Sequence, residues 1–270
     1  MTRLAAKRYT AVKCAFAAVG EESSGSKMTQ HLPDRLFADA YLTSLHDAWC
    51  PRDARDDYDF YLPRIMSAGA VLDAGCGTGT LLHEVRQRGH SGRLCGLDPA
   101  DGMLKRARWR DDIEWVCSDL ASVTFAREFD LVVMTGHAFQ AIVADDDIRH
   151  SIASVRRALV AGGCFAFETR NPSARARERW RPDNAVVVTG PDGAPVRIAT
   201  EVVVPFDGRT VSFTHTFTGN ALRRELERLH LSPPGSELSA EVNEVRAWTL
   251  HMGEARFVWL AGEQKSGAIR

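Results

Sequence analysis

Short apolar segments alternate with helical patterns through the middle of the chain. Five segments have strand character, namely AVLDA (70–74), RLCGLD (93–98), IEWVC (113–117), FDLVVM (129–134) and CFAFET (164–169). The segments between them place apolar residues at the helical period, as in LLHEVRQRG (81–89), ADGMLKRARWR (100–110) and IRHSIASVRRALVAGG (148–163). Nearly continuous apolar strands separated by helices are typical of a parallel sheet covered on both faces. The pattern therefore predicts an α/β core over residues 70–172.

The pattern changes on either side of this core. Residues 28–69 carry apolar residues near the helical period, with Pro63 as an expected kink or boundary, and are predicted to form a helical lid. Residues 173–220 alternate apolar and polar positions between Asp-Gly turns, which predicts an inserted antiparallel β-meander that caps the core. Residues 221–270 are expected to supply a helix (221–231) and two closing strands, AWTLHM and ARFVWLAG. Residues 1–27 are expected to be a flexible extension.

Charge and cysteine usage limit the classes of partner. The 270 residues contain 34 Lys and Arg against 35 Asp and Glu, a net charge of −1, so the composition favours neither nucleic-acid nor membrane partners. No apolar run approaches the roughly 18–20 residues that span a bilayer. The six cysteines form no C-x-x-C pair and no Cys/His cluster with zinc spacing, so no metal site is expected. Unpaired cysteines of this kind are typical of the reducing cytoplasm, where we expect the protein to act.

Three glycines follow the first predicted strand. Gly75, Gly77 and Gly79 form a G-x-G-x-G loop, in which the backbone can turn tightly and approach a ligand closely. A dinucleotide fingerprint would place its third glycine at position 80, which is Thr80, and a phosphate-binding P-loop would require a lysine that is absent here. Ligands of such sheets bind beyond the carboxyl ends of the strands. A ligand other than a pyrophosphate is therefore expected at this loop.

Acidic residues stand at the ends of the first three strands. Asp73 ends the first, Asp98 ends the second and Asp119 follows the third. A carboxylate at the tip of the second strand can accept hydrogen bonds from both ribose hydroxyls, and one after the third can accept from an exocyclic amine. Each carboxylate alone could equally be a helix N-cap or a loop residue. Three of them around one glycine loop favour a shared ligand.

The whole series of motifs resembles one family. VLDAGCGTG, GLDPADGML, CSDL, FDLVVM and LVAGGCFAFET, over about residues 68–172, resemble the class I S-adenosylmethionine-dependent methyltransferases. The resemblance implies a Rossmann-like, doubly wound sheet of seven strands whose last strand is antiparallel. It also implies S-adenosylmethionine as cofactor, with S-adenosylhomocysteine as its product. The residues expected to hold this cofactor are Asp73, Gly75, Cys76, Gly77, Gly79, Asp98, Pro99, Met103, Ser118, Asp119, Leu120 and Thr135.

The acceptor side is expected after the fourth strand. His137 is the predicted base, because an unperturbed imidazole titrates at about pH 6.5, although it could instead bond the backbone at a helix start or shape the cofactor pocket. Glu168 lies in an apolar strand and, if buried, should pair with Arg170 or a backbone amide. The residues expected to contact the acceptor are Tyr41, Tyr58, Phe139, Gln140, Arg170 and His215.

These features predict transfer of a methyl group to a nitrogen or oxygen of a small molecule, mainly by positioning and desolvation of the reactants. One alternative is a methyltransferase acting on RNA or protein, for which the basic stretch SARARERWRP (173–182) is the main support. The other is a cofactor-binding protein without methyl transfer. A small-molecule partner and a monomer or homodimer are expected, and metal-independent transfer is the default.

Overall fold

The computed structural model describes residues 14–15, 35–170, 175–219, 237–239, 243–246, 254–255 and 257–262. The predicted helix 221–231, the strand AWTLHM and most of the extension 1–27 lie outside the described residues. Within that extension, β1 (Cys14–Ala15) pairs with β12 (Glu254–Ala255).

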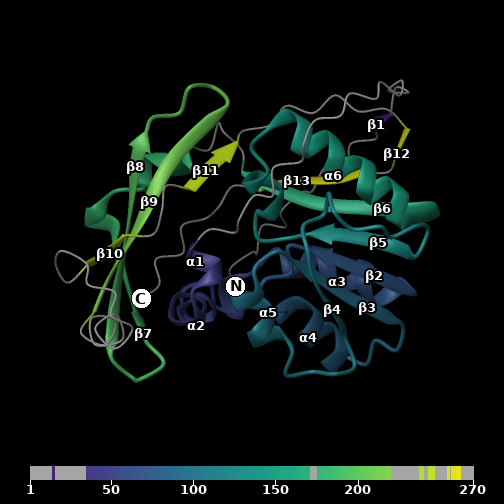
Figure 1. Ribbon diagram of the computed structural model, residues 1–270, viewed down its shortest axis with the longest axis horizontal. Helices are drawn as coiled ribbons and strands as arrows, with labels where there is room; N and C mark the ends of the chain where they lie inside the picture. Colours follow the sequence, from purple (N-terminus) through teal and green to yellow (C-terminus); the bar gives the residue numbers. More distant parts are fainter. Residues whose placement is uncertain are drawn as a thin grey trace, which may run out of the picture.

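A parallel sheet forms the centre of the molecule (Figure 1). Its strands run in the order β13-β6-β5-β2-β3-β4, and every neighbouring pair is parallel. The bounds are β2 (Ala70–Ala74), β3 (Arg93–Asp98), β4 (Glu114–Cys117), β5 (Phe129–Met134), β6 (Leu159–Arg170) and β13 (Phe257–Gly262). The order of the first five strands along the chain reverses between β2 and β5, which confirms the predicted doubly wound core.

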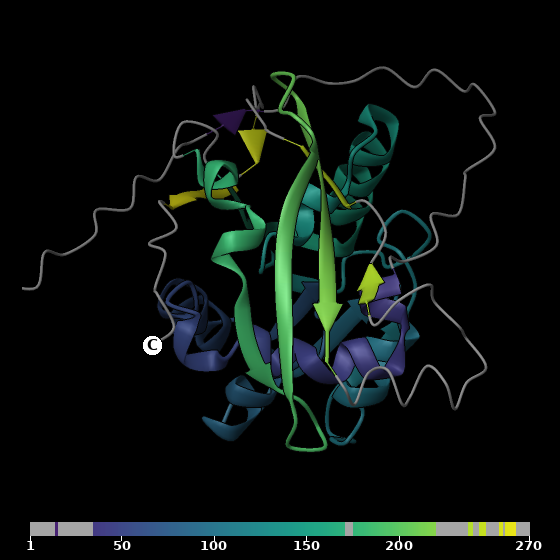
Figure 2. The same ribbon diagram turned by 90° about the vertical axis from the view of Figure 1, so that its left-hand side faces the viewer.

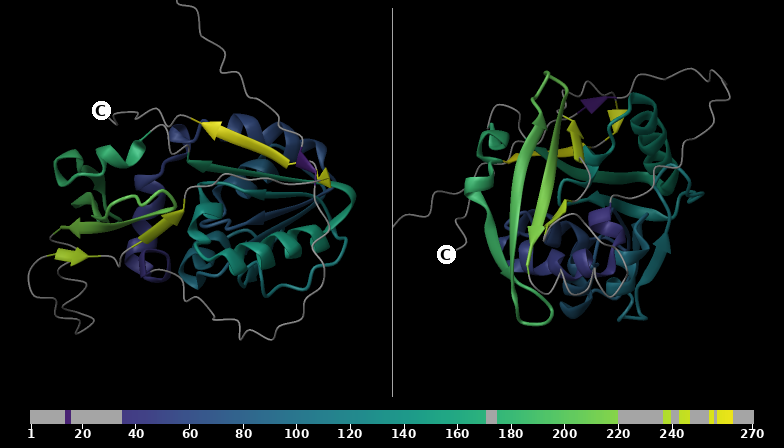
Figure 3. Two further views of the ribbon diagram at one scale, coloured as in Figure 1. Left: turned by 90° about the horizontal axis from the view of Figure 1, so that it is seen from above. Right: turned by 60° about the vertical axis from the view of Figure 1, so that its left-hand side comes forward.

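Helices cover both faces of this sheet, as the apolar strands require. On one face α6 (Asp145–Ala158) buries Ile148 and Val155 in a cluster that includes Phe165 of β6. On the other face α3 (Tyr58–Ser67) and α4 (Thr80–Gln87) pack on the alternate strand residues, and Tyr61 of α3 and Val85 of α4 belong to this second cluster. The view from above separates these layers (Figure 3). α5 (Asp101–Ala107) follows β3.

Short helices precede the sheet, as predicted. They are α1 (Arg35–Ala38), α2 (Ala40–Trp49), the 3-10 turn η1 (Arg52–Ala54) and α3. Asp39 caps α2, since its carboxylate accepts hydrogen bonds from the amides of Tyr41 and Leu42 at 2.9 and 3.0 Å. Pro63 lies inside α3, so its expected role as a helix boundary is wrong.

A second, antiparallel sheet forms a cap beside the core. β7 (Val186–Thr189), β8 (Pro195–Val204) and β9 (Thr210–Thr218) pair in sequence order, which confirms the predicted meander. β10 (Glu237–Ser239) and β11 (Asn243–Arg246) also pair with β9. Two further 3-10 turns, η4 (Ala176–Arg179) and η5 (Pro182–Asn184), lead into β7. Figure 2 shows β8 and β9 standing in front of the core, with α1 and α2 between the two sheets.

The predicted direction of the last strand is wrong. β13, which contains most of ARFVWLAG, runs parallel to β6, whereas an antiparallel closing strand was expected. A parallel neighbour needs a long crossover rather than a tight turn, and the stretch that separates β6 from β13, with the cap within it, provides the length. Six strands of this sheet lie in the described residues, and the further strand expected at AWTLHM lies outside them, so the expected number of seven stays a prediction.

The helix before β6 is also shorter than predicted. α6 ends at Ala158, and Gly162 and Gly163 lie within β6 instead of closing the helix. The carbonyls of Arg157 and Ala158 accept hydrogen bonds from the chain that enters β5, both at 2.8 Å, and Leu159 pairs with Phe129. Pairing with β5 therefore begins as soon as the helix ends.

Candidate functional site

The carboxyl ends of β2, β3, β5 and β6 lie together, because the strands are parallel, on the side of the core that faces the cap (Figure 1). The order of the strands reverses between β2 and β5, which is where open parallel sheets bind ligands. Asp98 ends β3, Asp73 and Glu168 lie within two residues of the ends of β2 and β6, and Thr135 and His137 follow β5.

The glycine loop joins β2 to α4. Gly75, Gly77 and Gly79 all have positive φ, at 77°, 56° and 76°. A Cβ on Gly79 would lie 2.5 Å from Trp115, and one on Gly75 would lie 2.6 Å from Ala138, so both are held by close packing. A Cβ on Gly77 would meet no protein atom within 4 Å. Gly77 is therefore the point at which the loop leaves room for a ligand.

Asp98 ties this loop to the end of β3. One carboxylate oxygen accepts the amide of Gly77 and the other accepts the amide of Ala100, both at 2.9 Å. The residue is 8% exposed, and burial raises the pKa of its carboxyl. Since each carboxylate oxygen has two lone pairs, both can accept one more hydrogen bond. The predicted role with ribose hydroxyls is compatible with this arrangement and stays a prediction.

Asp119 is held within its own loop. Its carboxylate accepts the amide of Ser122 at 2.7 Å and the hydroxyl of Ser122 at 2.9 Å. Asp119 thus has the loop role that any one of the three carboxylates could have had. Ser118 donates its amide to the carbonyl of Asp98 at 3.2 Å, so the ends of β3 and β4 are connected. Met103 and Leu120 are buried, whereas Pro99 is exposed.

Asp73 has an unusual environment. It is 1% exposed, and its Oδ1 is buried with no hydrogen-bond partner. Burial raises the pKa of Asp73 to about 7, with Asp98 and Asp57 adding to the shift and Arg55 opposing it. Buried polar atoms normally have a partner, so this oxygen is suited to a donor supplied by a ligand.

Arg55 is a central residue of the site that the sequence analysis missed. Its guanidinium holds Asp57 through two hydrogen bonds, at 2.9 and 2.7 Å, and donates to Thr135 Oγ1 at 3.3 Å. It lies over the ring of Tyr58, 4.6 Å from the centroid, and its charge lowers the pKa of Asp73. Arg55 lies 80 residues before Thr135, so the local sequence gives no signal of this contact. Only the many charged residues around Arg55 could have suggested a role.

His137 and Glu168 lie together beside this arginine. The amide of His137 donates to Glu168 Oε1 at 3.2 Å, and the imidazole Nδ1 lies 3.7 Å from the same oxygen. The expectation that a buried Glu168 would pair with a backbone amide is confirmed. The pKa of Glu168 is raised to about 7. Burial is the main cause and Asp57 adds to it, whereas Arg55 and the amides of His137 and Gly136 oppose the shift.

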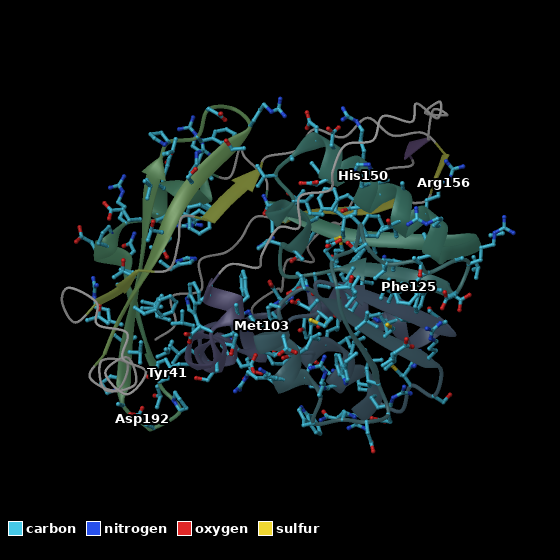
Figure 4. The ribbon with its side chains drawn as sticks, in the orientation of Figure 1. Tyr41, Met103, Phe125, His150, Arg156 and Asp192 are labelled. Atoms are coloured by element: carbon cyan, nitrogen blue, oxygen red, sulfur yellow. The ribbon has the colours of Figure 1, made fainter. Side chains whose placement is uncertain are left out.

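The residues predicted to contact the acceptor are not all at this site. Tyr58 is buried in α3, and Phe139 packs in the core with Phe165 and Phe167. Tyr41 lies under the cap near Asp192, away from Met103 (Figure 4). Gln140 is buried in η2 (Ala138–Ala141). Arg170 ends β6, and its side chain is outside the described set.

His215 faces a different neighbourhood. Its Nδ1 lies 2.9 Å from Thr200 Oγ1, and its ring meets Trp49 of α2 edge-on with centroids 4.6 Å apart. It therefore lies where the cap meets the helical lid. Its predicted contact with the acceptor, like those of Tyr41, Tyr58, Phe139, Gln140 and Arg170, stays a prediction.

No group of three or more His, Cys, Asp or Glu side chains among the described residues is arranged to hold a metal ion. In the same residues, no helix combines the length and the apolar character needed to cross a bilayer.

Comparison with known proteins identifies the core. A family profile described as a methyltransferase domain matches residues 71–163. The 2-phytyl-1,4-naphtoquinone methyltransferase of Thermosynechococcus vestitus is 34% identical over 156 residues, which are 56% of this chain and 65% of that protein. The dTDP-3-amino-3,4,6-trideoxy-alpha-D-glucopyranose N,N-dimethyltransferase of Streptomyces venezuelae is 29% identical over 177 residues, 64% of this chain and 66% of that protein. The match spans 65%, 35% and 40% of three curated relatives, so it falls short of two thirds of their length.

Solved structures extend the likeness of the fold beyond the core. The sugar N-methyltransferase KedS8 from Streptoalloteichus aligns over 87% of this chain and 86% of its own, with a TM-score of 0.55 and 14% identity. The CcbJ methyltransferase from Streptomyces caelestis aligns over 79% of this chain and 82% of its own, with a TM-score of 0.56 and 16% identity. The motifs, the strand order and the family profile agree: residues 71–163 form a methyltransferase domain of the class I S-adenosylmethionine-dependent type.

Proposed function

We propose that this chain transfers a methyl group from S-adenosylmethionine to a nitrogen or oxygen nucleophile of a small molecule. The observation that carries the proposal is the buried Oδ1 of Asp73, which has no hydrogen-bond partner and lies at the start of the glycine loop. Membership of the family supplies the identity of the cofactor. The structure supplies residues that suit its parts.

Each part of the cofactor has a matching group at the strand ends. The second lone pairs of Asp98 suit the ribose hydroxyls, and the unpartnered oxygen of Asp73 suits the ammonium of the methionine portion. Arg55 has five N–H donors, of which Asp57 and Thr135 use only some, so the rest suit the methionine carboxylate. Met103 and Leu120 would give apolar cover to the adenine.

Charge at the site also favours a cation. Asp57, Asp73 and Glu168 all interact with the guanidinium of Arg55, so three carboxyl groups share its positive charge. Burial of Asp73 and Glu168 in a poorly solvated region strengthens their attraction for an incoming positive charge. When bound, the cofactor supplies a methyl group already activated on a positively charged sulfur. The remaining work of the protein is to hold the acceptor in line, exclude water and take up a proton.

His137 is the residue best placed to take that proton. It follows β5, and its side chain is partly exposed. The residue before it, Gly136, lies next to the guanidinium of Arg55. β11 of the cap lies against η2, which begins at the residue after His137, so the cap covers the His137 segment. A covered site of this kind fits a small acceptor better than a nucleic acid, and the balanced charge of the chain agrees. One curated relative is by name an N,N-dimethyltransferase of a nucleotide-linked amino sugar, which supports a nitrogen nucleophile on a small molecule. The quinone methyltransferase supports a small acceptor without indicating which atom is methylated.

Calorimetric titration of S-adenosylmethionine and of S-adenosylhomocysteine into the full chain is the first test, and we expect one saturable site for each. Isotope-labelled methyl transfer is then measured against a panel of phenols, hydroquinones, primary amines and amino sugars, with total RNA and denatured protein as macromolecular controls. Label in a small acceptor supports the proposal. Failure of the folded chain to bind either compound, or label only in RNA or protein, contradicts it. Tight binding with no transfer to any acceptor would favour a cofactor-binding protein instead.

A further inference from the structure

The carboxylate of Glu168 meets His137 at two points. Its Oε1 accepts the amide of His137 at 3.2 Å and lies 3.7 Å from the imidazole Nδ1. The side chains of the two residues are 20% and 11% exposed, histidine first, so the carboxylate lies deeper than the ring. The carboxylate therefore holds the backbone of His137 by a hydrogen bond, and it faces the Nδ1 side of the ring at a distance that a small rotation of the ring would close to a hydrogen bond.

The backbone at this point is constrained for the same purpose. His137 has φ 68° and ψ 18°, in the left-handed region, directly after Gly136 with φ 62°. A residue with a Cβ adopts this conformation only at an energetic cost, and such strain collects at functional sites. The amides of Gly136 and His137 both bond Glu168, which stabilises the conformation.

We propose that Glu168 is a positioning residue that holds the imidazole of His137 in the tautomer protonated on Nδ1, so that Nε2 accepts the proton of the methyl acceptor. This inference rests on the proposed function. As the acceptor oxygen or nitrogen bonds to the methyl carbon, the carbon–sulfur bond breaks with its electron pair on sulfur. The acceptor's proton passes to Nε2, and the resulting imidazolium is stabilised by the carboxylate of Glu168 before the proton is released to water.

The neighbouring charges suit such a pair. Burial is the largest cause of the raised pKa of Glu168, which is about 7. Asp57 also raises it, and Arg55 lowers it. Tyr61 stays neutral because burial and Glu168 raise the pKa of its hydroxyl well above the usual value, and Asp73 raises it further. Glu168 is therefore expected to change its charge near neutral pH while it faces the imidazole of His137.

Nitrogen NMR of the full chain with ¹⁵N-labelled histidine tests the pair without any acceptor. The His137 signals are assigned with His137→Gln, and the tautomer is read from the two ring-nitrogen shifts. In the wild-type protein we expect the neutral ring to carry its proton on Nδ1, although free imidazole side chains favour Nε2. A wild-type ring protonated on Nε2 would overturn the proposal even if no variant folds.

Glu168→Gln keeps the size of the side chain and removes its charge. We expect the midpoint of the His137 titration to fall by about one pH unit or more, because the imidazolium loses an ionised partner. Thr200→Val is the matched control, since it removes the side-chain partner of His215 and should shift only the His215 signals. An unchanged His137 midpoint in a folded Glu168→Gln sample refutes the pairing.

Kinetics separate this inference from the proposed function. Once an acceptor is known, Glu168→Gln should lower kcat by about tenfold or more and move the acid limb of the pH profile, with the Kd for S-adenosylmethionine unchanged within about twofold. A parallel loss of cofactor affinity would show that Glu168 acts on binding and would contradict the positioning role. If the wild-type chain binds no S-adenosylmethionine, the proposed function fails, whereas the NMR result on the His137–Glu168 contact still stands.

Discussion

At the scale of single residues, Asp98 serves the loop and the proposed ligand with the same two oxygens. Its hydrogen bonds to Gly77 and Ala100 already order the loop before any ligand binds. We expect Asp98→Ala to weaken S-adenosylmethionine binding by at least about tenfold per lost ribose bond, because hydrogen bonds to charged groups contribute about 1.5–3 kcal/mol each. Calorimetry measures the effect. Asp101→Ala is the matched control, since Asp101 is an exposed carboxylate on the next helix that pairs with Lys105 and Arg108. Equal affinities in the wild type and Asp98→Ala would remove Asp98 from the site.

Asp73 makes a prediction about pH and stability. Its pKa is raised from 3.8 to about 7 in the folded chain, so the folded state binds the proton more tightly than the unfolded state. The free energy of unfolding should therefore fall as pH rises from about 4 to about 7, by up to about 4 kcal/mol for a shift of about three units. Glu168, raised from 4.5 to about 7, acts in the same direction. Asp47 acts oppositely, but only between about pH 2 and 4, because its pKa is lowered to about 2.

Asp73→Asn isolates this contribution. Urea denaturation of the ligand-free protein between pH 4.5 and 8 should show a shallower pH dependence in the variant, which should be more stable than the wild type above pH 7. The same variant should bind S-adenosylmethionine more weakly, because the ionised partner of the ammonium is lost. Parallel stability curves for the two proteins would show that Asp73 does not carry the shift.

At the scale of elements, the loop between β2 and α4 separates two kinds of glycine. Gly79→Ala places a Cβ 2.5 Å from Trp115, and Gly77→Ala places one where no protein atom lies within 4 Å. Both substitutions carry the left-handed strain of about 1–2 kcal/mol. We expect Gly79→Ala to lower the thermal midpoint of unfolding much more than Gly77→Ala. Gly77→Ala should lower this midpoint by only a few degrees but lose most of the affinity for the cofactor. Thermal melts with and without S-adenosylmethionine measure both. A Gly77→Ala protein with wild-type affinity would show that the ligand does not approach the loop there.

Elements with a strong local period were predictable, and contacts between distant segments were not. The five core strands, the glycine loop and the meander follow from apolar patterns of 4–10 residues, each of which has a local physical cause. The role of Arg55 depends on Thr135 and Glu168, more than 70 residues away, and no periodicity encodes such a meeting. Phe139 shows the same limit, because its position after a strand indicates nothing of the contacts that its ring makes with Phe165 and Phe167 in the core. The direction of β13 depends on the path of a long connection, which a local hairpin pattern cannot report.

At the scale of the whole molecule, α2 is shared between the cap and the cofactor loop. One side packs Leu42 and Leu45 against the cap strands, together with Val196 and Phe217. Its other side carries Asp47, which accepts the hydroxyl of Thr78 in the glycine loop at 2.6 Å. This bond and His46 lower the pKa of Asp47 to about 2 even though burial, the largest cause, opposes the shift. A single helix thus connects the antiparallel cap sheet to the loop proposed to bind the cofactor.

This connection predicts that the cap and the core unfold together. Leu45 is 0% exposed, and Leu45→Ala should cost about 2–5 kcal/mol, as for other large-to-small changes in a packed core. If α2 couples the two sheets, hydrogen exchange followed by mass spectrometry should show faster exchange both in β8–β9 and in the glycine loop of the variant. Thr78→Val is the matched variant on the other side of α2, and it should loosen the loop while β8–β9 keep their protection, because the cap contacts of Leu45 remain. Faster exchange confined to the cap in Leu45→Ala would mean that the two sheets are independent units, and that α2 transmits no effect between acceptor and cofactor.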